Sequence, residues 1–206
     1  MKQCHKALSA WMLAGWALAV LIGCGDRASE GERSGSPDTS SAVGTADTGS
    51  TGGERPCSAA ELEPDESDPP GLSAPVGEMR RGILRAAVTC DYERLEALAF
   101  EGGTTFAHSF GGDSMPAAYW RALEEQGEEP LAMLVQTLAL PFAREDSDVY
   151  VWPSAATDQA TGFDWMALEG LYSDEEIATF INYGSFLGWR VGISEEGDWR
   201  FFVAGD

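Results

Sequence analysis

The sequence predicts an α+β fold, in which a small antiparallel sheet with a C-terminal β-hairpin packs against several helices. The hairpin is indicated by two stretches of alternating residues, 189–193 and 199–203, on either side of the loop Glu195-Glu196-Gly197. Pairing Ser194 with Asp198 would give the hairpin one wholly apolar face. The residues on that face would be Trp189, Val191, Ile193, Trp199, Phe201 and Val203.

Two more strands and five helices complete the predicted domain. Strands are expected at 104–110 and at about 148–152. The helical spacing of apolar residues predicts helices at about 76–90, 91–101, 116–126, 130–140 and 173–186. Asp91 and Ser173 are placed to cap the second and the last of them. The last helix has an apolar stripe formed by Ile177, Phe180 and Ile181. This order of elements is loosely similar to cone-shaped folds of the NTF2 type, an analogy that implies no function.

The N-terminus has the features of a secretory signal peptide. Lys2, His5 and Lys6 precede residues 7–22, a run of 16 residues without a charged side chain. A helix that spans a bilayer needs about 20 apolar residues. A signal peptide is therefore the better interpretation of this run, and an uncleaved membrane anchor is the alternative.

The end of this run, Leu21-Ile22-Gly23-Cys24, resembles the bacterial lipobox. In proteins with a lipobox the cysteine receives a diacylglyceryl thioether, and the chain is cut before it. The resemblance implies that residues 1–23 are a lipoprotein signal peptide and that Cys24 carries the lipid. The protein is then expected outside the cytoplasm, held by acyl chains on the cell membrane or the outer membrane. A cysteine placed here by coincidence is the alternative.

The next 50 residues have the composition of a disordered linker. Residues 36–41 and 44–53 are rich in Ser, Thr, Gly and Asp, and 61–68 are acidic, so little apolar surface is available for burial. The expected organisation is a lipidated N-terminus with an acidic and Gly-Ser-Thr linker at 24–75, followed by one α+β domain at 76–206.

The protein is a polyanion. The full chain has 13 basic and 34 acidic residues and a formal net charge of −21. Loss of Lys2 and Lys6 with the signal peptide would leave 11 basic residues, all arginine, and a net charge of −23. Such a chain is not expected to bind nucleic acid or anionic lipid headgroups, so the lipid anchor would be its sole contact with the membrane. An envelope protein or ligand is the expected partner.

Two cysteines remain after the signal peptide and the lipid site are set aside. Cys57 and Cys90 form an even pair in a compartment outside the cytosol, which predicts one disulfide. Two free thiols are the alternative.

The inventory of side chains excludes several kinds of catalysis. His108 is the one histidine after the predicted signal, which excludes His-Glu-x-x-His zinc sites. The absence of lysine from the same part of the chain excludes Schiff-base enzymes and the phosphate-binding lysine of P-loop proteins. We expect neither a metal site nor a cofactor.

His108, Tyr150 and Trp152 are the candidate pocket residues. His108 is flanked by Phe106 and Phe110, and it is either an acid–base or ligand contact or a hydrogen-bonded histidine at the edge of the core. Aromatic residues could line a groove for a peptide or glycan, or belong to the core. They are Tyr150, Trp152, Trp165, Tyr172 and Trp189.

Two segments, 149–153 and 189–206, resemble a group of bacterial exported proteins of unknown function. The resemblance implies that 76–206 is a domain used in more than one protein, and it transfers no activity.

The leading hypothesis is a non-catalytic binding or accessory domain at the cell envelope. The alternative is a carboxylate-based hydrolase that acts on an envelope polymer, and a structural subunit is a third interpretation. A concave pocket that brings carboxylates together would favour the hydrolase. A closed core with an exposed aromatic patch would favour partner binding.

Overall fold

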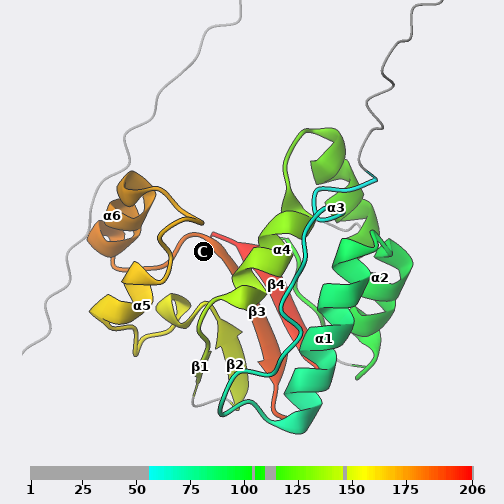
Figure 1. The fold of residues 1–206 in the computed structure, drawn as a ribbon, viewed down its shortest axis with the longest axis horizontal. Helices are drawn as coiled ribbons and strands as arrows, with labels where there is room; N and C mark the ends of the chain where they lie inside the picture. Colours follow the sequence, from blue (N-terminus) through cyan, green and yellow to red (C-terminus); the bar gives the residue numbers. More distant parts are fainter. Residues whose placement is uncertain (1–55, 104, 110–114, 146–147, 206) are drawn as a thin grey trace, which may run out of the picture. The chain divides into compact units, whose positions relative to one another are not determined.

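The computed structural model describes residues 56–103, 105–109, 115–145 and 148–205. The predicted signal peptide, Cys24 and most of the predicted linker lie outside these ranges. Within them, six α-helices and a four-stranded antiparallel sheet form an α+β fold with a C-terminal hairpin, as predicted (Figure 1). No helix in the described ranges is both long enough and apolar enough to cross a membrane.

The sheet has the strand order β1-β2-β3-β4, so each strand pairs with its neighbour in the chain. The strands are β1 (Ala143–Arg144), β2 (Val149–Trp152), β3 (Trp189–Ser194) and β4 (Trp199–Ala204). The predicted strand near 148–152 corresponds to β2, and β1 is an additional short strand at the edge of the sheet. Residues 154–188, between β2 and β3, form a separate helical lobe.

Four helices precede the sheet: α1 (Ala74–Val88), α2 (Tyr92–Phe100), α3 (Pro116–Glu125) and α4 (Pro130–Ala139). Proline at the first turn of α1, α3 and α4 suits the start of a helix, because its missing N–H would have no partner there. The Asp91 carboxylate caps α2 by accepting a hydrogen bond of 2.9 Å from the backbone N–H of Arg94, as predicted.

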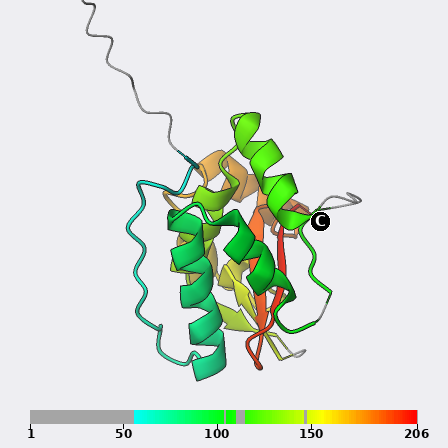
Figure 2. The same cartoon turned by 90° about the vertical axis from the view of Figure 1, so that its right-hand side faces the viewer.

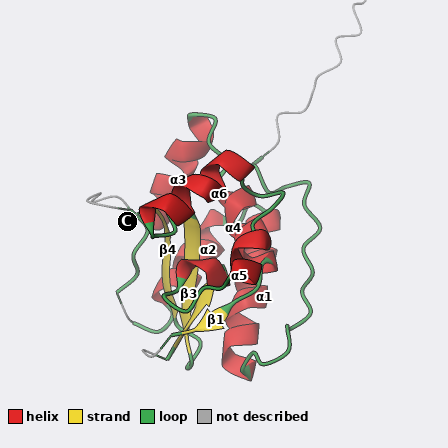
Figure 3. Cartoon of the chain, turned by 90° about the vertical axis from the view of Figure 1, so that its left-hand side faces the viewer, coloured by secondary structure: helices red, strands yellow, loops and turns green. Residues whose placement is uncertain are grey.

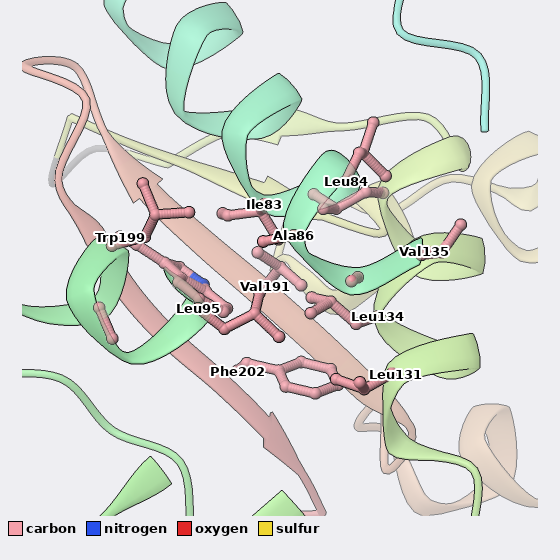
Figure 4. Close-up of a cluster of buried hydrophobic side chains, with 14 of the residues drawn as sticks. Ile83, Leu84, Ala86, Leu95, Leu131, Leu134, Val135, Val191, Trp199 and Phe202 are labelled. Atoms are coloured by element: carbon pink, nitrogen blue, oxygen red, sulfur yellow. The ribbon is translucent and has the colours of Figure 1, made fainter. Parts of the chain in front are cut away.

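Helices α1, α2 and α4 cover one face of the sheet, and α3 packs beside α2 and α4 (Figures 1 and 2). Ile83, Leu95 and Leu134 from the three covering helices meet Val191 and Phe202 of the hairpin, and all five are fully buried (Figure 4). Burying each such side chain contributes about 1.5–3 kcal/mol. This layer is the main hydrophobic core.

A β-bulge changes the predicted register of the hairpin. Ile193 pairs with Trp199 as predicted, but the next pair is Gly192 with Phe201, so Arg200 is left over on β4. One extra residue on one strand shifts every later side chain by one position.

The predicted apolar face is therefore wrong beyond the bulge. Phe202, and not Phe201, lies opposite Val191 in the core, and Val203 lies on the other face of β4. The physical reason is found at Gly192, where an added Cβ would collide with the Phe201 ring. Phe201 thus occupies space that a strand glycine leaves open.

The predicted strand at 104–110 is reduced to a single bridge in the described residues. Ala107 pairs in parallel with Phe201 and exchanges backbone hydrogen bonds with Arg200 and Phe202 at 3.0 and 2.9 Å. Residues 104 and 110 lie outside the described ranges. The segment 105–109 therefore lies along β4 as an irregular edge.

The folded domain also begins earlier than predicted, because residues 56–73 pack on it. We call these residues the N-terminal strap, which Figure 2 shows running alongside α1. Cys57 and Ala59 of the strap are buried in the main core. Arg81 pairs with Asp68, and Arg85 pairs with Glu66 at 2.5 Å. Acidic residues that were expected to be solvated linker thus hold the strap on α1.

The disulfide between Cys57 and Cys90 is present, as predicted, with the two Cα atoms 5.7 Å apart. Cys57 stands at the start of the strap, and Cys90 at the corner between α1 and α2. The bridge thus fixes the first described residues to the helical layer.

Candidate functional site

The three candidate pocket residues are not brought together. Tyr150 and Trp152 on β2 are 5% and 0% exposed, and their rings pack on Phe142 with centroids 5.6 and 5.3 Å apart. They belong to the main core, so they offer no surface for a ligand. These two positions fit the core interpretation of the aromatic set.

His108 lies beyond the opposite edge of the sheet. Its ring is half-buried, stacks on Phe106 at 6.1 Å and meets Tyr119 edge-on at 5.5 Å. Strands β3 and β4 lie between β2 and the segment that carries His108. A pocket formed jointly by His108, Tyr150 and Trp152 is therefore absent from the described structure.

The feature that stands apart from the main core is the helical lobe, residues 154–188. It contains the 3₁₀ turn η1 (Ser154–Ala156), α5 (Gly162–Met166) and α6 (Asp174–Tyr183). The lobe has a small hydrophobic core of its own, made of Ala155, Leu168, Ile177, Phe180 and Phe186. It therefore has its own packing, on the side of the molecule that faces the viewer in Figure 3.

Tyr172 joins the lobe to the sheet. Its ring contacts Phe180 and Phe186 edge-on at 5.4 and 5.7 Å, and its phenol oxygen accepts a 2.8 Å hydrogen bond from the backbone N–H of Trp189 in β3. Burial raises the pKa of Tyr172 to about 12. The phenol therefore stays protonated at neutral pH and fixes the lobe against the start of β3.

Both helices of the lobe have capping boxes. Asp164 accepts hydrogen bonds from the Thr161 backbone N–H at 2.7 Å and from the Ser154 hydroxyl at 2.5 Å. These donors hold the pKa of Asp164 below its usual value, that of Ser154 having the larger effect. Ser173 and Glu176 cap α6 reciprocally, as predicted. The orientation of both short helices is thus fixed by side-chain hydrogen bonds.

Four large apolar side chains of the lobe point into solvent. They are Phe163 (83% exposed), Met166 (60%), Ile181 (52%) and Tyr183 (74%). The rest of the described chain adds only two more exposed large hydrophobic residues, Phe100 and Met115. We use the name α5–α6 face for these four residues and the surfaces of the two helices that carry them. Four such side chains on one small lobe make the lobe a candidate protein–protein contact surface.

The exposure of Ile181 differs from the prediction. Ile181 was expected in the buried stripe of α6 with Ile177 and Phe180, but it is half exposed. The lobe's core is too small to cover three positions of α6, and Phe186 after the helix fills the remaining space.

The charge of the lobe is uniform in sign. Between Ser154 and Gly188 the sequence has six acidic residues and no lysine or arginine. The four exposed apolar side chains therefore lie in a negative field, which favours a partner with basic residues beside its own apolar side chains.

The described part of the chain shows no candidate metal site. No group of three or more His, Cys, Asp or Glu side chains is arranged there to hold a metal ion.

With this geometry in hand, we compared the chain with known proteins. The chain matches no protein-family model, no curated protein and no solved structure. The NTF2-type analogy and the likeness to bacterial exported proteins therefore stay predictions.

Proposed function

We propose that the protein is an extracytoplasmic lipoprotein that binds a partner protein at the cell envelope through its α5–α6 face. The observation that carries the proposal is the exposure of Phe163, Met166, Ile181 and Tyr183 on a lobe whose helices are rigidly capped. Exposing aromatic and aliphatic side chains to water is unfavourable, and a partner that covered them would recover that free energy.

The membrane anchor in this proposal rests on the lipobox-like sequence at Leu21–Cys24. A disulfide between Cys57 and Cys90 is compatible with a location outside the cytoplasm, where thiols are oxidised. A negatively charged domain would be repelled by anionic headgroups, so its contact with the membrane would depend on the acyl chains.

The hydrolase hypothesis is favoured by one cleft that four glutamates line, Glu124, Glu125, Glu128 and Glu129, but it has less support. Both carboxylate oxygens of Glu124 accept hydrogen bonds from Ser58, one from the backbone N–H at 3.0 Å and one from the hydroxyl at 2.6 Å. A carboxylate that already accepts these two hydrogen bonds is poorly placed to exchange protons with a substrate.

The partner-binding proposal predicts that polar substitutions on the α5–α6 face abolish capture of the partner. The full-length chain, purified in detergent and immobilised, should retain a specific protein from an envelope extract of its own cells. Phe163→Ser combined with Tyr183→Ser should weaken that binding about 30-fold or more, because even one aromatic anchor of an interface contributes about 2 kcal/mol or more.

The matched control is Phe100→Ser combined with Met115→Ser, which removes two exposed apolar side chains outside the lobe. This control should bind like the wild type. Equal capture by all three proteins would contradict the proposed face. Raising the salt concentration should weaken binding to the wild type, because the acidic lobe would be screened from a basic partner.

The anchor is tested separately, by labelling cells with a fatty acid. The wild-type chain and Cys4→Ser should incorporate the label, because Cys4 would leave with the signal peptide, and Cys24→Ser should not. Labelling of Cys24→Ser at the wild-type level would show that the lipid is attached elsewhere and would contradict the lipobox interpretation.

A further inference from the structure

A second feature lies apart from the α5–α6 face, where the start of the N-terminal strap meets α2 and the turn between α3 and α4. Here the surface encloses a cleft of about 420 Å³. Its lining includes Ser58, Tyr92, Arg121, Glu124, Glu125 and Glu128. We call it the Tyr92 cleft. Its volume lies within the range of small-molecule sites in proteins.

The cleft is preformed by bonds that do not depend on a ligand. The Cys57–Cys90 disulfide fixes one wall to the α1–α2 corner. The Ser58 hydroxyl donates to Glu124 at 2.6 Å and accepts from the backbone N–H of Ala132 at 3.0 Å. These contacts join the strap to α3 and α4, so the walls are held in place before anything binds.

Tyr92 is the unusual residue of this cleft. Its side chain is only 4% exposed, and the guanidinium carbon of Arg121 lies 4.1 Å from its ring centre. Within the described residues, its hydroxyl makes no hydrogen bond. Burial, together with the nearby Glu124, raises the pKa of Tyr92 to about 12, so the phenol is neutral at physiological pH. A hydroxyl without a protein partner in the wall of a cleft is a group that a ligand can bind.

The charges around the cleft determine the class of ligand. Four glutamates, Glu124, Glu125, Glu128 and Glu129, line it, and Arg121 is the one cation of the lining. Arg121 already lies on the Tyr92 ring, and Glu124 already accepts from Ser58. The carboxylates of Glu125 and Glu128 attract cations and repel anions.

We propose that the Tyr92 cleft binds a small aliphatic polyamine, with ammonium groups on Glu125 and Glu128 and one N–H donated to the Tyr92 phenol oxygen. An ammonium group has several N–H donors and no acceptor, which matches carboxylates and an unpartnered phenol oxygen. The site is distinct from the α5–α6 face, so it would give the protein a second, small-molecule ligand.

The test is calorimetric titration of spermidine into the full-length chain in detergent at neutral pH and about 0.15 M salt, where long-range attraction is screened beyond about 8 Å. The wild type should show saturable binding to one site. Glu125→Gln combined with Glu128→Gln should weaken binding at least tenfold, because two charge-assisted contacts are lost. Tyr92→Phe should weaken it about fivefold to tenfold, since it removes one hydrogen bond and keeps the ring under Arg121.

The matched control is Asp158→Asn combined with Glu169→Gln, which removes the same charge from exposed positions on the helical lobe. Wild-type affinity in this control would support a localised site. An equal loss in both double variants would show attraction by the overall charge and would overturn the proposal. Absence of saturable binding to the wild type, or full affinity in Tyr92→Phe, would also overturn it.

Phe163→Ser combined with Tyr183→Ser should leave spermidine binding unchanged, so the two proposals can fail independently.

Discussion

Removing the disulfide by Cys57→Ala combined with Cys90→Ala is expected to lower the free energy of unfolding by about 3.5–4 kcal/mol. The two cysteines are 33 positions apart, and the bridge limits the conformations that this loop can adopt in the unfolded chain. For a folded unit of roughly 150 residues, the loss corresponds to a Tm lower by about 8–15 °C. Thermal unfolding followed by circular dichroism measures it.

Reductant provides the control for this prediction. A thiol reductant should lower the Tm of the wild type toward that of the double variant, and it should leave the double variant unchanged. Hydrogen exchange should also become faster in the N-terminal strap, because the disulfide holds its first residues. Equal Tm values for wild type and double variant would contradict a structural role for the bridge.

The arrangement of helices on a sheet could be predicted because local signals and tertiary packing agree. Asp91 caps α2 and Ser173 caps α6 where the sequence indicates, and the apolar spacing of α1 and α4 matches the faces they bury. The disulfide was predicted by elimination, since Cys57 and Cys90 were the cysteines without another expected role.

The departures from prediction have a common physical origin in contacts between distant segments. The bulge at Arg200 depends on the Phe201 ring lying over Gly192, which alternation along one strand does not reveal. The strap resembles a linker because it is polar and rich in acids. It is ordered because arginines of α1 bind it, which a composition argument cannot anticipate.

The candidate surfaces were harder to predict than the fold. Tyr150 and Trp152 are candidate pocket residues because they are aromatic, but aromatic character alone does not distinguish a core residue from a surface residue. Phe163 and Met166, at i and i+3 of a short helix in a stretch without basic residues, were the available sequence signal for the α5–α6 face. The helical spacing of Tyr92, Leu95 and Leu98 indicates only that they share one side of α2. The cleft beside Tyr92 depends on the strap and α3, which are distant from it in the sequence.

Arg80→Met is expected to lower the free energy of unfolding by about 3–4 kcal/mol. Arg80 is only 3% exposed and donates to three backbone carbonyls: Leu138 at 3.1 Å, Ser67 at 3.0 Å and Asp65 at 3.0 Å. The Arg80 side chain on α1 thus donates a hydrogen bond to a carbonyl near the C-terminal end of α4 and also binds the strap. Methionine fills much of the same volume without a donor, so the carbonyls lose their partner. Urea denaturation measures the difference.

Two further variants distinguish the stabilisation due to the hydrogen bonds of Arg80 from the stabilisation due to its charge. Arg94→Met removes the same charge from a side chain that is 52% exposed and paired with Glu101 at 3.7 Å, and it should cost less than about 1 kcal/mol. Arg80→Lys keeps the charge, but one ammonium group cannot reach three carbonyls on two segments, so most of the loss should persist. If Arg80→Lys were as stable as the wild type, the positive charge at this position would account for the stabilisation, and the three hydrogen bonds would not. If Arg80→Met cost no more than Arg94→Met, the strap would be held by its ion pairs and the disulfide instead.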